Sequence, residues 1–170
     1  MTKKIANWLT RALPWYGLAG AALLIDQVTK YATVFYMTYG TQIRITTFFN
    51  LVHVRNEGAA FSFLADAGGW QRYFFIAVAL GISVYLALLL RRDLARLEAA
   101  GYALILGGAL GNVTDRILRG SVVDFLDFHI RSAHWPAFNL ADVSIFLGAA
   151  CIIGAALIAK NPTADDQRTG

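Results

Sequence analysis

Two aspartates in largely apolar segments are the residues of this chain best suited to chemistry. Asp124 lies in Val122-Val-Asp-Phe-Leu-Asp-Phe, and Asp142 ends Phe138-Asn-Leu-Ala-Asp. Two carboxylates close together in a partly desolvated site cannot both ionise easily, so one pKa rises and the pair can share a proton. Such a pair can take a proton from water and give one to a leaving group. Spacing alone leaves three interpretations open: a catalytic pair, a proton or ion relay, and structural pairing.

Further polar residues accompany these aspartates at helical spacings. Asn112, Asp115, Arg116 and Arg119 are expected on one helical face, and Asn139 lies three residues before Asp142. Asp26 and Lys30 interrupt the first apolar segment. Ionisable residues inside a membrane span are costly and are therefore functional candidates, with structural pairing as the alternative. For Asp26 and Asp115 a structural role is favoured, Asp115 with Arg116, Lys30 or backbone groups as partner.

Other hydrolytic chemistries lack their sequence signatures. Ser121, Ser144 and His129 are present, but no serine stands in a Gly-x-Ser-x-Gly motif. The three histidines have no His-Glu-x-x-His spacing, and Cys151 is the single cysteine. We therefore expect neither a metal nor a cofactor.

The composition indicates an integral membrane protein. Hydrophobic residues make up 57% of the 170 residues and charged residues 15%, and the mean hydropathy is +0.51. This is more apolar surface than a soluble domain could bury. The net charge of +4 does not indicate a nucleic-acid partner, because most Lys and Arg residues stand at the ends of apolar runs.

The apolar runs predict an all-α membrane protein with four transmembrane helices in a single domain, residues 1 to 170. The spans are expected at about residues 13 to 37, 70 to 90, 98 to 117 and 136 to 159. The third run is rich in glycine, which suits close helix packing. The outer loop, about residues 38 to 69, should carry a small β-containing cap with strands between residues 41 and 64. Residues 161 to 170 are expected to be a disordered tail.

The distribution of basic residues predicts the orientation. Eight Lys and Arg residues flank one side of the expected spans (3, 4, 11, 91, 92, 96, 160 and 168), and four flank the other (44, 55, 119 and 131). The positive-inside rule then places both termini in the cytoplasm. A cleavable signal peptide is the competing interpretation of the first run.

The chain resembles the bacterial lipoprotein signal peptidases (signal peptidase II) over almost its whole length. The similar segments are Asp26-Gln-Val-Thr-Lys, Asn56-Glu-Gly-Ala-Ala-Phe-Ser, Gly111-Asn-Val-Thr-Asp-Arg and the two aspartate motifs above. The resemblance implies that Asp124 and Asp142 are the catalytic pair, that Asn56 and Arg116 contact the substrate, and that Asn112 and Asn139 orient the carboxylates or the peptide. Asp26, Lys30 and Asp115 would support the site.

The same resemblance implies the reaction and the partners. The expected function is an aspartyl endopeptidase that removes the signal peptide from diacylglyceryl-modified prolipoproteins, before the lipidated cysteine, at the outer face of the bacterial inner membrane. Membrane lipids are expected partners, and a monomer is expected. A small proton-coupled carrier that uses Asp26, Lys30, Asp115 and Asp142 is the alternative, and it requires polar residues across the full membrane depth.

Overall fold

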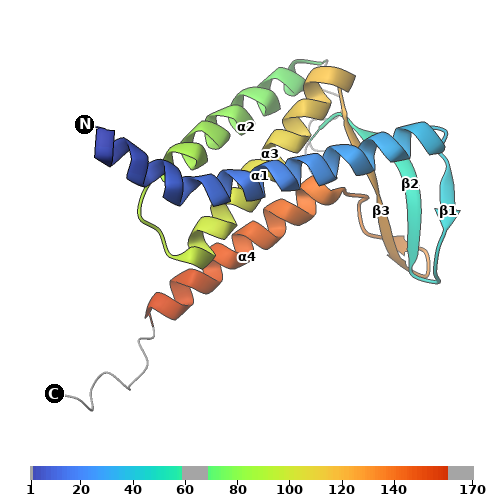
Figure 1. Ribbon diagram of the computed structural model, residues 1–170. Coiled ribbons are helices and arrows are strands. Elements are labelled where there is room, and N and C mark those ends of the chain that lie inside the picture. The colour runs from blue at the N-terminus through green and yellow to red at the C-terminus, as the bar shows by residue number, and fades with distance from the viewer. Residues whose placement is uncertain (1, 59–68, 161–170) are drawn as a thin grey trace, which may run out of the picture.

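The computed structural model describes residues 2–58 and 69–160, which form a helical bundle with a small antiparallel sheet at one end (Figure 1). The expectations for the tail and for part of the outer loop lie outside these residues. In chain order, the elements are α1 (Thr2–Tyr36), β1 (Gln42–Arg44), β2 (Phe49–Asn56), α2 (Trp70–Leu89), α3 (Arg96–Arg119), β3 (Val122–Ile130), β4 (Ala133–His134) and α4 (Leu140–Lys160).

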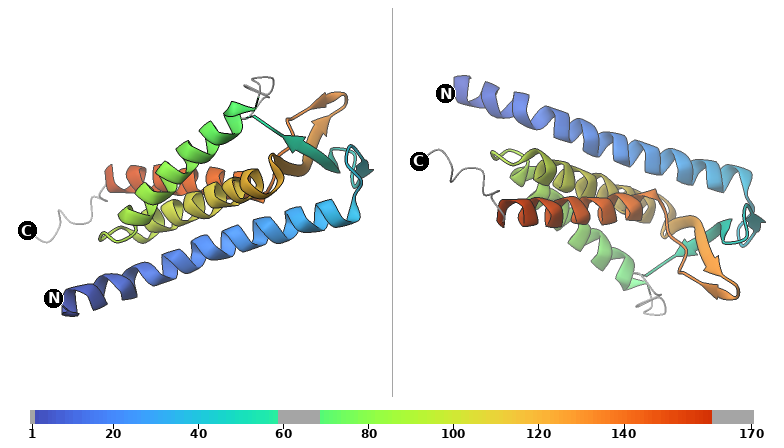
Figure 2. Two further views of the ribbon diagram at one scale, coloured as in Figure 1. Left: turned by 90° about the horizontal axis from the view of Figure 1, so that it is seen from above. Right: turned by 90° about the horizontal axis from the view of Figure 1, so that it is seen from below.

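Helix α3 is the centre of the bundle and packs against α1, α2 and α4. The start of α1 and the end of α4 lie at the end of the bundle away from the sheet (Figure 2). Helix α1 begins at Thr2, well before the expected residue 13, and includes the polar start of the chain. The bundle therefore carries its sheet at the end where α1 and α3 finish and α2 and α4 begin.

Glycines allow α3 and α4 to approach closely, as their number in the third apolar run predicted. A Cβ on Gly101 would lie 2.7 Å from the carbonyl oxygen of Gly148, and one on Gly148 would lie 2.6 Å from that of Gly101. Real Cβ atoms do not come so close, so a side chain at either position would push the helices apart.

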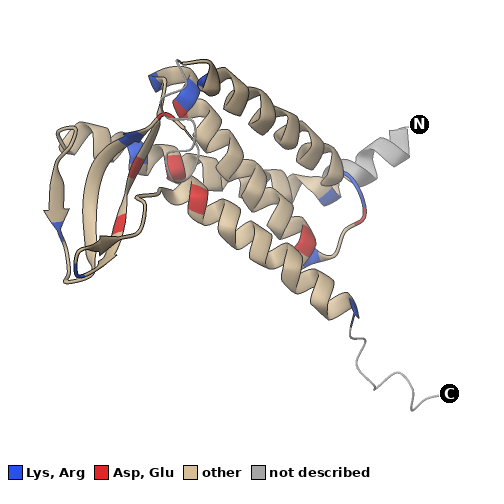
Figure 3. Cartoon of the chain, turned by 180° about the vertical axis from the view of Figure 1, so that it is seen from behind, with Lys and Arg blue, Asp and Glu red and all other residues tan. Residues whose placement is uncertain are grey.

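The outer surface of the bundle is strongly apolar. By length and composition, α2 and α4 could each cross a membrane, and large side chains such as Val84 and Phe146 are exposed. Charged residues gather near the two ends of the bundle (Figure 3). An apolar belt between charged ends is the pattern that a bilayer requires.

The sheet is larger than the sequence analysis expected. Its four strands follow the order β1-β2-β3-β4, and all neighbours are antiparallel. The strands expected between residues 41 and 64 are confirmed by β1 and β2. However, β3 was not predicted as a strand, although it pairs with β2 from Phe49↔Phe128 to Asn56↔Val122. That pairing joins segments some 70 residues apart, which local patterns do not show.

The start of the fourth helix was placed too early. Residues before α4 continue alongside the sheet, since Trp135 N donates to the Phe128 carbonyl and Phe138 exchanges backbone hydrogen bonds with Leu126. Helix α4 begins only at Leu140. Asp142 is therefore in the first helical turn and not two turns inside, as a start at residue 136 would imply.

Candidate active site

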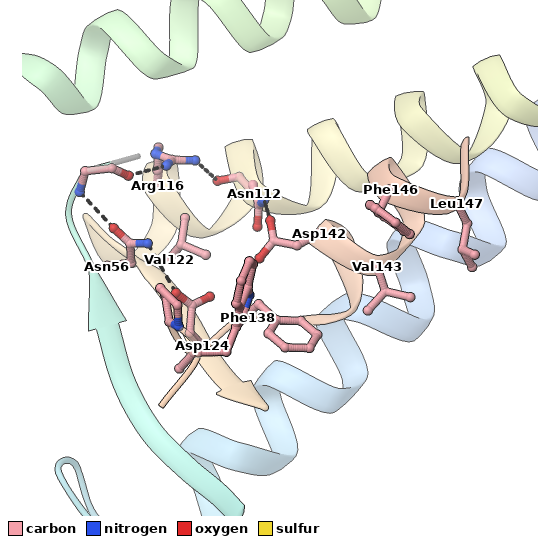
Figure 4. A pocket seen from close by; sticks show the side chains of 14 residues that line it. Asn56, Asn112, Arg116, Val122, Asp124, Phe138, Asp142, Val143, Phe146 and Leu147 are labelled. Carbon is pink, nitrogen blue, oxygen red and sulfur yellow. Dashed lines mark hydrogen bonds between the residues drawn. The ribbon is translucent and has the colours of Figure 1, made fainter. Parts of the chain in front are cut away.

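A cavity of about 580 Å³ lies where the sheet meets the bundle (Figure 4). Asp124 of β3 and Asp142 of α4 both line it. The remaining lining residues are Asn56, Gly58, Asn112, Arg116, Val122, Trp135, Pro136, Ala137, Phe138, Val143, Phe146 and Leu147. Most of these side chains are apolar, so the two carboxylates stand in a largely apolar pocket.

Two asparagines hold the carboxylate of Asp124. Asn139 Nδ2 donates to its Oδ1 at 2.6 Å, and Asn56 Nδ2 donates to its Oδ2 at 3.3 Å. Burial and the nearby negative charge of Asp142 raise the pKa of Asp124 to about 7 from the usual 3.8, because both disfavour its ionised form. The amide bonds and the positive charge of Lys30 oppose this shift and do not cancel it.

Asp142 is positioned by the start of its own helix. Asn139 Oδ1 accepts the backbone N–H of Asp142 at 3.0 Å, and Asp142 Oδ2 accepts the backbone N–H of Asn139 at 3.2 Å. This reciprocal pair has the arrangement of a capping box, which satisfies N–H groups that lack a partner at a helix start. Asn112 Nδ2 donates to Asp142 Oδ1 at 2.9 Å. One asparagine, Asn139, therefore contacts both aspartates.

The orientation of the Asn112 amide is set by Lys30. The Lys30 ammonium donates to Asn112 Oδ1 at 2.9 Å, which leaves the Nδ2 side of the amide to face Asp142. Lys30 is fully buried in the middle of this arrangement. It therefore acts on Asp142 through Asn112 rather than by a salt bridge.

Arg116 lies at the cavity, as the sequence analysis proposed. Its guanidinium donates to the carbonyl of Gly58 at 2.9 Å and lies 5.2 Å from the ring centroid of Phe75. It forms no salt bridge with a described carboxylate. The expected alternative of an Asp115–Arg116 pair is therefore not found, and the guanidinium stays at the edge of the cavity.

A second group of buried charges lies on the α1 side of α3. Lys30 Nζ is 2.9 Å from Asp26 Oδ2 and 3.6 Å from Asp115 Oδ2, and Arg119 forms an ion pair with Asp115. Gln27 Nε2 donates to both carboxylates, at 3.1 and 3.3 Å. The polar face expected on α3 thus divides: Asn112 and Arg116 face the cavity, and Asp115 and Arg119 face α1.

These ion-paired carboxylates also hold the backbone next to each cavity aspartate. Asp115 Oδ2 accepts the N–H of Val123 at 2.9 Å, and Asp26 Oδ1 accepts the N–H of Ala141 at 2.8 Å. Val123 precedes Asp124 and Ala141 precedes Asp142. The supporting residues of the sequence analysis are therefore in contact with the segments that carry both aspartates.

Asp127 is separate from the cavity although it is only three residues from Asp124. Side chains three positions apart on a strand point to opposite faces. Asn50 Nδ2 donates to Asp127 Oδ2 at 2.7 Å, and His134 Nδ1 lies 2.8 Å from Asp127 Oδ1. Burial alone would raise the pKa of Asp127, but the bonds from Asn50 and His134 outweigh it and lower that pKa.

Two of the three histidines have structural partners outside the cavity. His53 is buried with Nδ1 2.9 Å from the Met37 carbonyl, and His134 is beside Asp127. Within residues 2–58 and 69–160, no group of three or more His, Cys, Asp or Glu side chains could hold a metal ion.

The apolar wall of the cavity was not predicted from the sequence. Val143, Phe146 and Leu147 line it beyond Asp142 along α4 (Figure 4). For Phe146 the signal was present in the spacing, since a residue four positions after Asp142 lies on the same side of the helix. Phe138 and Trp135 could not be found in this way, because they reach the cavity through the path of the chain before α4.

This arrangement can carry out general acid–base chemistry. One buried carboxyl has a pKa near 7, a second carboxylate lines the same cavity, and three amides fix both. Such a pair can hold one proton and exchange it with a water or an amide placed between them. The fold and the site together define a membrane protein with a candidate acid–base centre at one end of its bundle.

The comparisons give the family. The sequence profile described as signal peptidase (SPase) II matches residues 18–158 of this chain. The chain therefore belongs to the signal peptidase II family and is a peptidase. It is 51% identical over 142 residues to a lipoprotein signal peptidase of Janthinobacterium sp. (strain Marseille), covering 83% of this chain and 86% of that protein. It is 46% identical over 153 residues to that of Serratia marcescens, covering 90% of each.

Solved structures agree with the fold. One, described as a bacterial membrane enzyme, superposes with a TM-score of 0.78 at 33% identity and covers 89% of this chain and 93% of its own. A second with the same description gives a TM-score of 0.74 at 33% identity, with coverage of 85% and 92%. The chain thus has the fold of a bacterial membrane enzyme.

Proposed function

We propose that this protein is an aspartyl endopeptidase that removes the signal peptide from diacylglyceryl-modified prolipoproteins. One observation carries the proposal: Asp124 and Asp142 line one cavity, are held by asparagine amides, and form no salt bridge with a described residue. Carboxylates neutralised by cations would be poor proton carriers, whereas amides orient them and leave their protons exchangeable.

The two aspartates take different roles at neutral pH. Asp124 holds the shared proton, because burial and Asp142 raise its pKa to about 7. Asp142 takes a proton from the attacking water, while Asp124 donates to the oxygen of the scissile carbonyl. The proton taken by Asp142 then passes to the leaving amine as the C–N bond breaks, and Asp124 recovers its proton from the hydroxyl group that becomes the carbonyl of the product. No metal or cofactor takes part in these steps.

The cavity suits a substrate that is itself anchored in a membrane. Phe146 is 74% and Leu147 49% exposed, and both continue the cavity wall along α4 away from the sheet. An apolar signal peptide, or the acyl chains on the cysteine, would pack against this wall. Arg116 and Asn56 stand at the polar end, where they would bind backbone carbonyls beside the cleaved bond. The relatives' name, lipoprotein signal peptidase, agrees with cleavage before a lipidated cysteine.

We further propose a single inner-membrane domain that crosses the bilayer four times as a monomer, with both termini cytoplasmic. The positive-inside count supports this orientation, as does the position of the start of α1 and the end of α4 at the same end of the bundle (Figure 2). It places the sheet and the cavity on the outer side, in contact with outer-leaflet lipids. The carrier alternative is not favoured, because α2 after Arg72 and α4 between Asp142 and Lys160 carry no charge, so a polar path does not cross the bundle.

Cleavage by purified variants tests the proposal. Asp124→Asn and Asp142→Asn should each reduce the rate at least about 10³-fold in detergent with a diacylglyceryl-modified prolipoprotein, because an amide cannot take or share the proton. The signal-peptide band on a gel is the readout. Asp127→Asn is the matched control, since Asp127 is buried in the same strand but faces away from the cavity.

The outcomes separate clearly. Loss of cleavage in both site variants, with wild-type cleavage per folded molecule in the control, supports the dyad. Substantial cleavage by either Asp124→Asn or Asp142→Asn contradicts it. Cleavage of an unmodified precursor at the same rate would contradict the proposed requirement for lipid.

A further inference from the structure

A second concave site lies at the end of the bundle farthest from the sheet. It has a volume of about 360 Å³ and is formed by α1 and by the turn between α2 and α3. Arg11, Arg92 and Arg96 line it together with Trp15, above a floor that includes Leu90 and Ala99. The floor side chains are 2% and 1% exposed, so the site has a rigid apolar base.

The charge of this site is not balanced by its own residues. Asp93 is its one acidic lining residue, and its Oδ2 lies 3.1 Å from Arg11 Nη1. The side chains of that pair are 65% and 88% exposed, so water and salt weaken it. Arg92 and Arg96 form no ion pair with any side chain described for residues 10–58 and 69–160. Three guanidinium groups against one carboxylate leave an excess of two positive charges.

The level of the site matches the depth of lipid phosphates. The apolar helix α2 ends at Leu89, and Arg92 follows three residues later. On the bilayer side of this level, Val84 and Leu88 are 60% and 54% exposed and would contact acyl chains. Tryptophan is enriched at the membrane interface, and half-buried Trp15 lies at the same level. Guanidinium groups thus stand directly beyond an apolar surface.

We propose that this pocket binds the phosphate of an anionic glycerophospholipid in the leaflet on the side of the termini. The forked guanidinium groups of Arg92 and Arg96 would contact the phosphate oxygens, which they match in geometry. Trp15 and the apolar floor would contact the glycerol backbone. A zwitterionic lipid carries its own ammonium group beside the phosphate, so the surplus charge of the pocket favours an anionic headgroup. The inference rests on the membrane placement proposed above and not on the peptidase activity.

Lipid retention measured by native mass spectrometry tests this site. Purified protein is exchanged into an equal mixture of phosphatidylglycerol and phosphatidylcholine, and bound lipids are counted. Wild type should retain phosphatidylglycerol preferentially, and Arg92→Gln/Arg96→Gln should reduce that preference about tenfold or more. The control is Arg44→Gln/Arg131→Gln, which removes the same charge at the sheet end and should keep the wild-type preference.

The proposed site is wrong if the preference for phosphatidylglycerol is equal in all three proteins, or if it falls equally in the control variant. Glycerol phosphate distinguishes the two sources of the same chemistry: if it displaces the bound lipid at equal concentration, the pocket is a phosphate site and the lipid assignment is wrong. Both double variants should cleave the prolipoprotein at the wild-type rate in detergent. Failure of the peptidase proposal would therefore leave the lipid-retention result valid. Failure of the lipid proposal would likewise leave the cleavage result valid.

Discussion

Two groups of carboxylates lie on either side of α3 and differ in their partners. On the α1 side, Asp26 and Asp115 are paired with Lys30 and Arg119. On the cavity side, Asp124 and Asp142 have amide partners and form no salt bridge in the described part of the chain. Cations fix the ionised state of a carboxylate, whereas amides orient it and leave the shared proton exchangeable. The difference separates residues that hold the structure from residues suited to chemistry.

The two groups are not independent. Each ion-paired aspartate accepts the backbone N–H of the residue before one cavity aspartate, and Lys30 belongs to one group while it orients Asn112 of the other. The ion-paired group therefore positions the cavity carboxylates Asp124 and Asp142. The cavity group itself holds the exchangeable proton. Variants should separate these two contributions.

The largest expected effect is loss of the fold on removal of an ion-paired carboxylate. Asp115→Ala leaves buried Lys30 and partly buried Arg119 with one carboxylate too few and frees the N–H of Val123. Removing one partner of a buried ion pair costs about 3–5 kcal/mol of unfolding free energy. The melting temperature in detergent measures it. Asp124→Asn is the comparison variant, and Asp115→Ala should melt at a lower temperature than it does. If it does not, the distinction between a structural group and a chemical group of carboxylates is wrong.

Lys30→Met should lower kcat about 100-fold at nearly constant KM. Without the ammonium, the Asn112 amide can turn its oxygen toward Asp142 and displace that carboxylate, and small displacements of a catalytic group have effects of this size. Rates are measured per folded molecule. Thr33→Val, a buried polar change on the same helix, is the control and should keep the wild-type kcat.

A double-mutant cycle sharpens this prediction. If Lys30 acts through Asn112, then Lys30→Met should have little further effect on kcat in an Asn112→Ala background. Equal effects of Lys30→Met in both backgrounds would mean that Lys30 influences catalysis by another route.

The cleavage rate should fall as the pH rises through about 7, by up to tenfold per unit above it. The shared proton is lost when Asp124 ionises, and burial and Asp142 have raised its pKa to about 7. The charged groups that act on this carboxylate are Asp142 of α4, Lys30 of α1 and Arg116 of α3. A pH–rate profile of kcat/KM, which reports the free enzyme, tests this, and a constant value from pH 7 to 9 would contradict the assigned proton donor.

The smallest expected effect is that Asp124→Asn is more stable than wild type at alkaline pH. The folded-state pKa of Asp124 lies above its unfolded value of 3.8, so the folded state binds the proton more tightly and loses stability as the pH rises from 3.8 to about 7. Asp124→Asn cannot ionise and should melt about 5 °C higher than wild type at pH 8. Near pH 4 the two should melt at similar temperatures. A variant that melts lower at pH 8 would show that the carboxylate stabilises the fold.

Local patterns in the sequence were sufficient for much of the fold. The apolar runs predicted the positions of α2 and α3 closely, the glycine content of α3 predicted its close packing with α4, and the β-prone residues after α1 predicted β1 and β2. They failed at β3 and at the start of α4. There the chain pairs with β2, far away in sequence, and Trp135 and Phe138 are held beside the sheet before the helix begins.

The sequence by itself determined which residue types were available and predicted the helices that carry most of them. Its motifs predicted Asp124 and Asp142 as the candidate catalytic pair, together with Asn56, Asn112, Asn139 and Arg116. Tertiary structure alone decided which carboxylates would meet a cation and which an amide. Asp115 and Asn112 are three residues apart on one helix, yet Asp115 faces Lys30 and Arg119 while Asn112 faces Asp142. The physical reason is that burial and charge pairing depend on neighbours supplied by distant segments, and these distinguish a structural carboxylate from one that can exchange a proton.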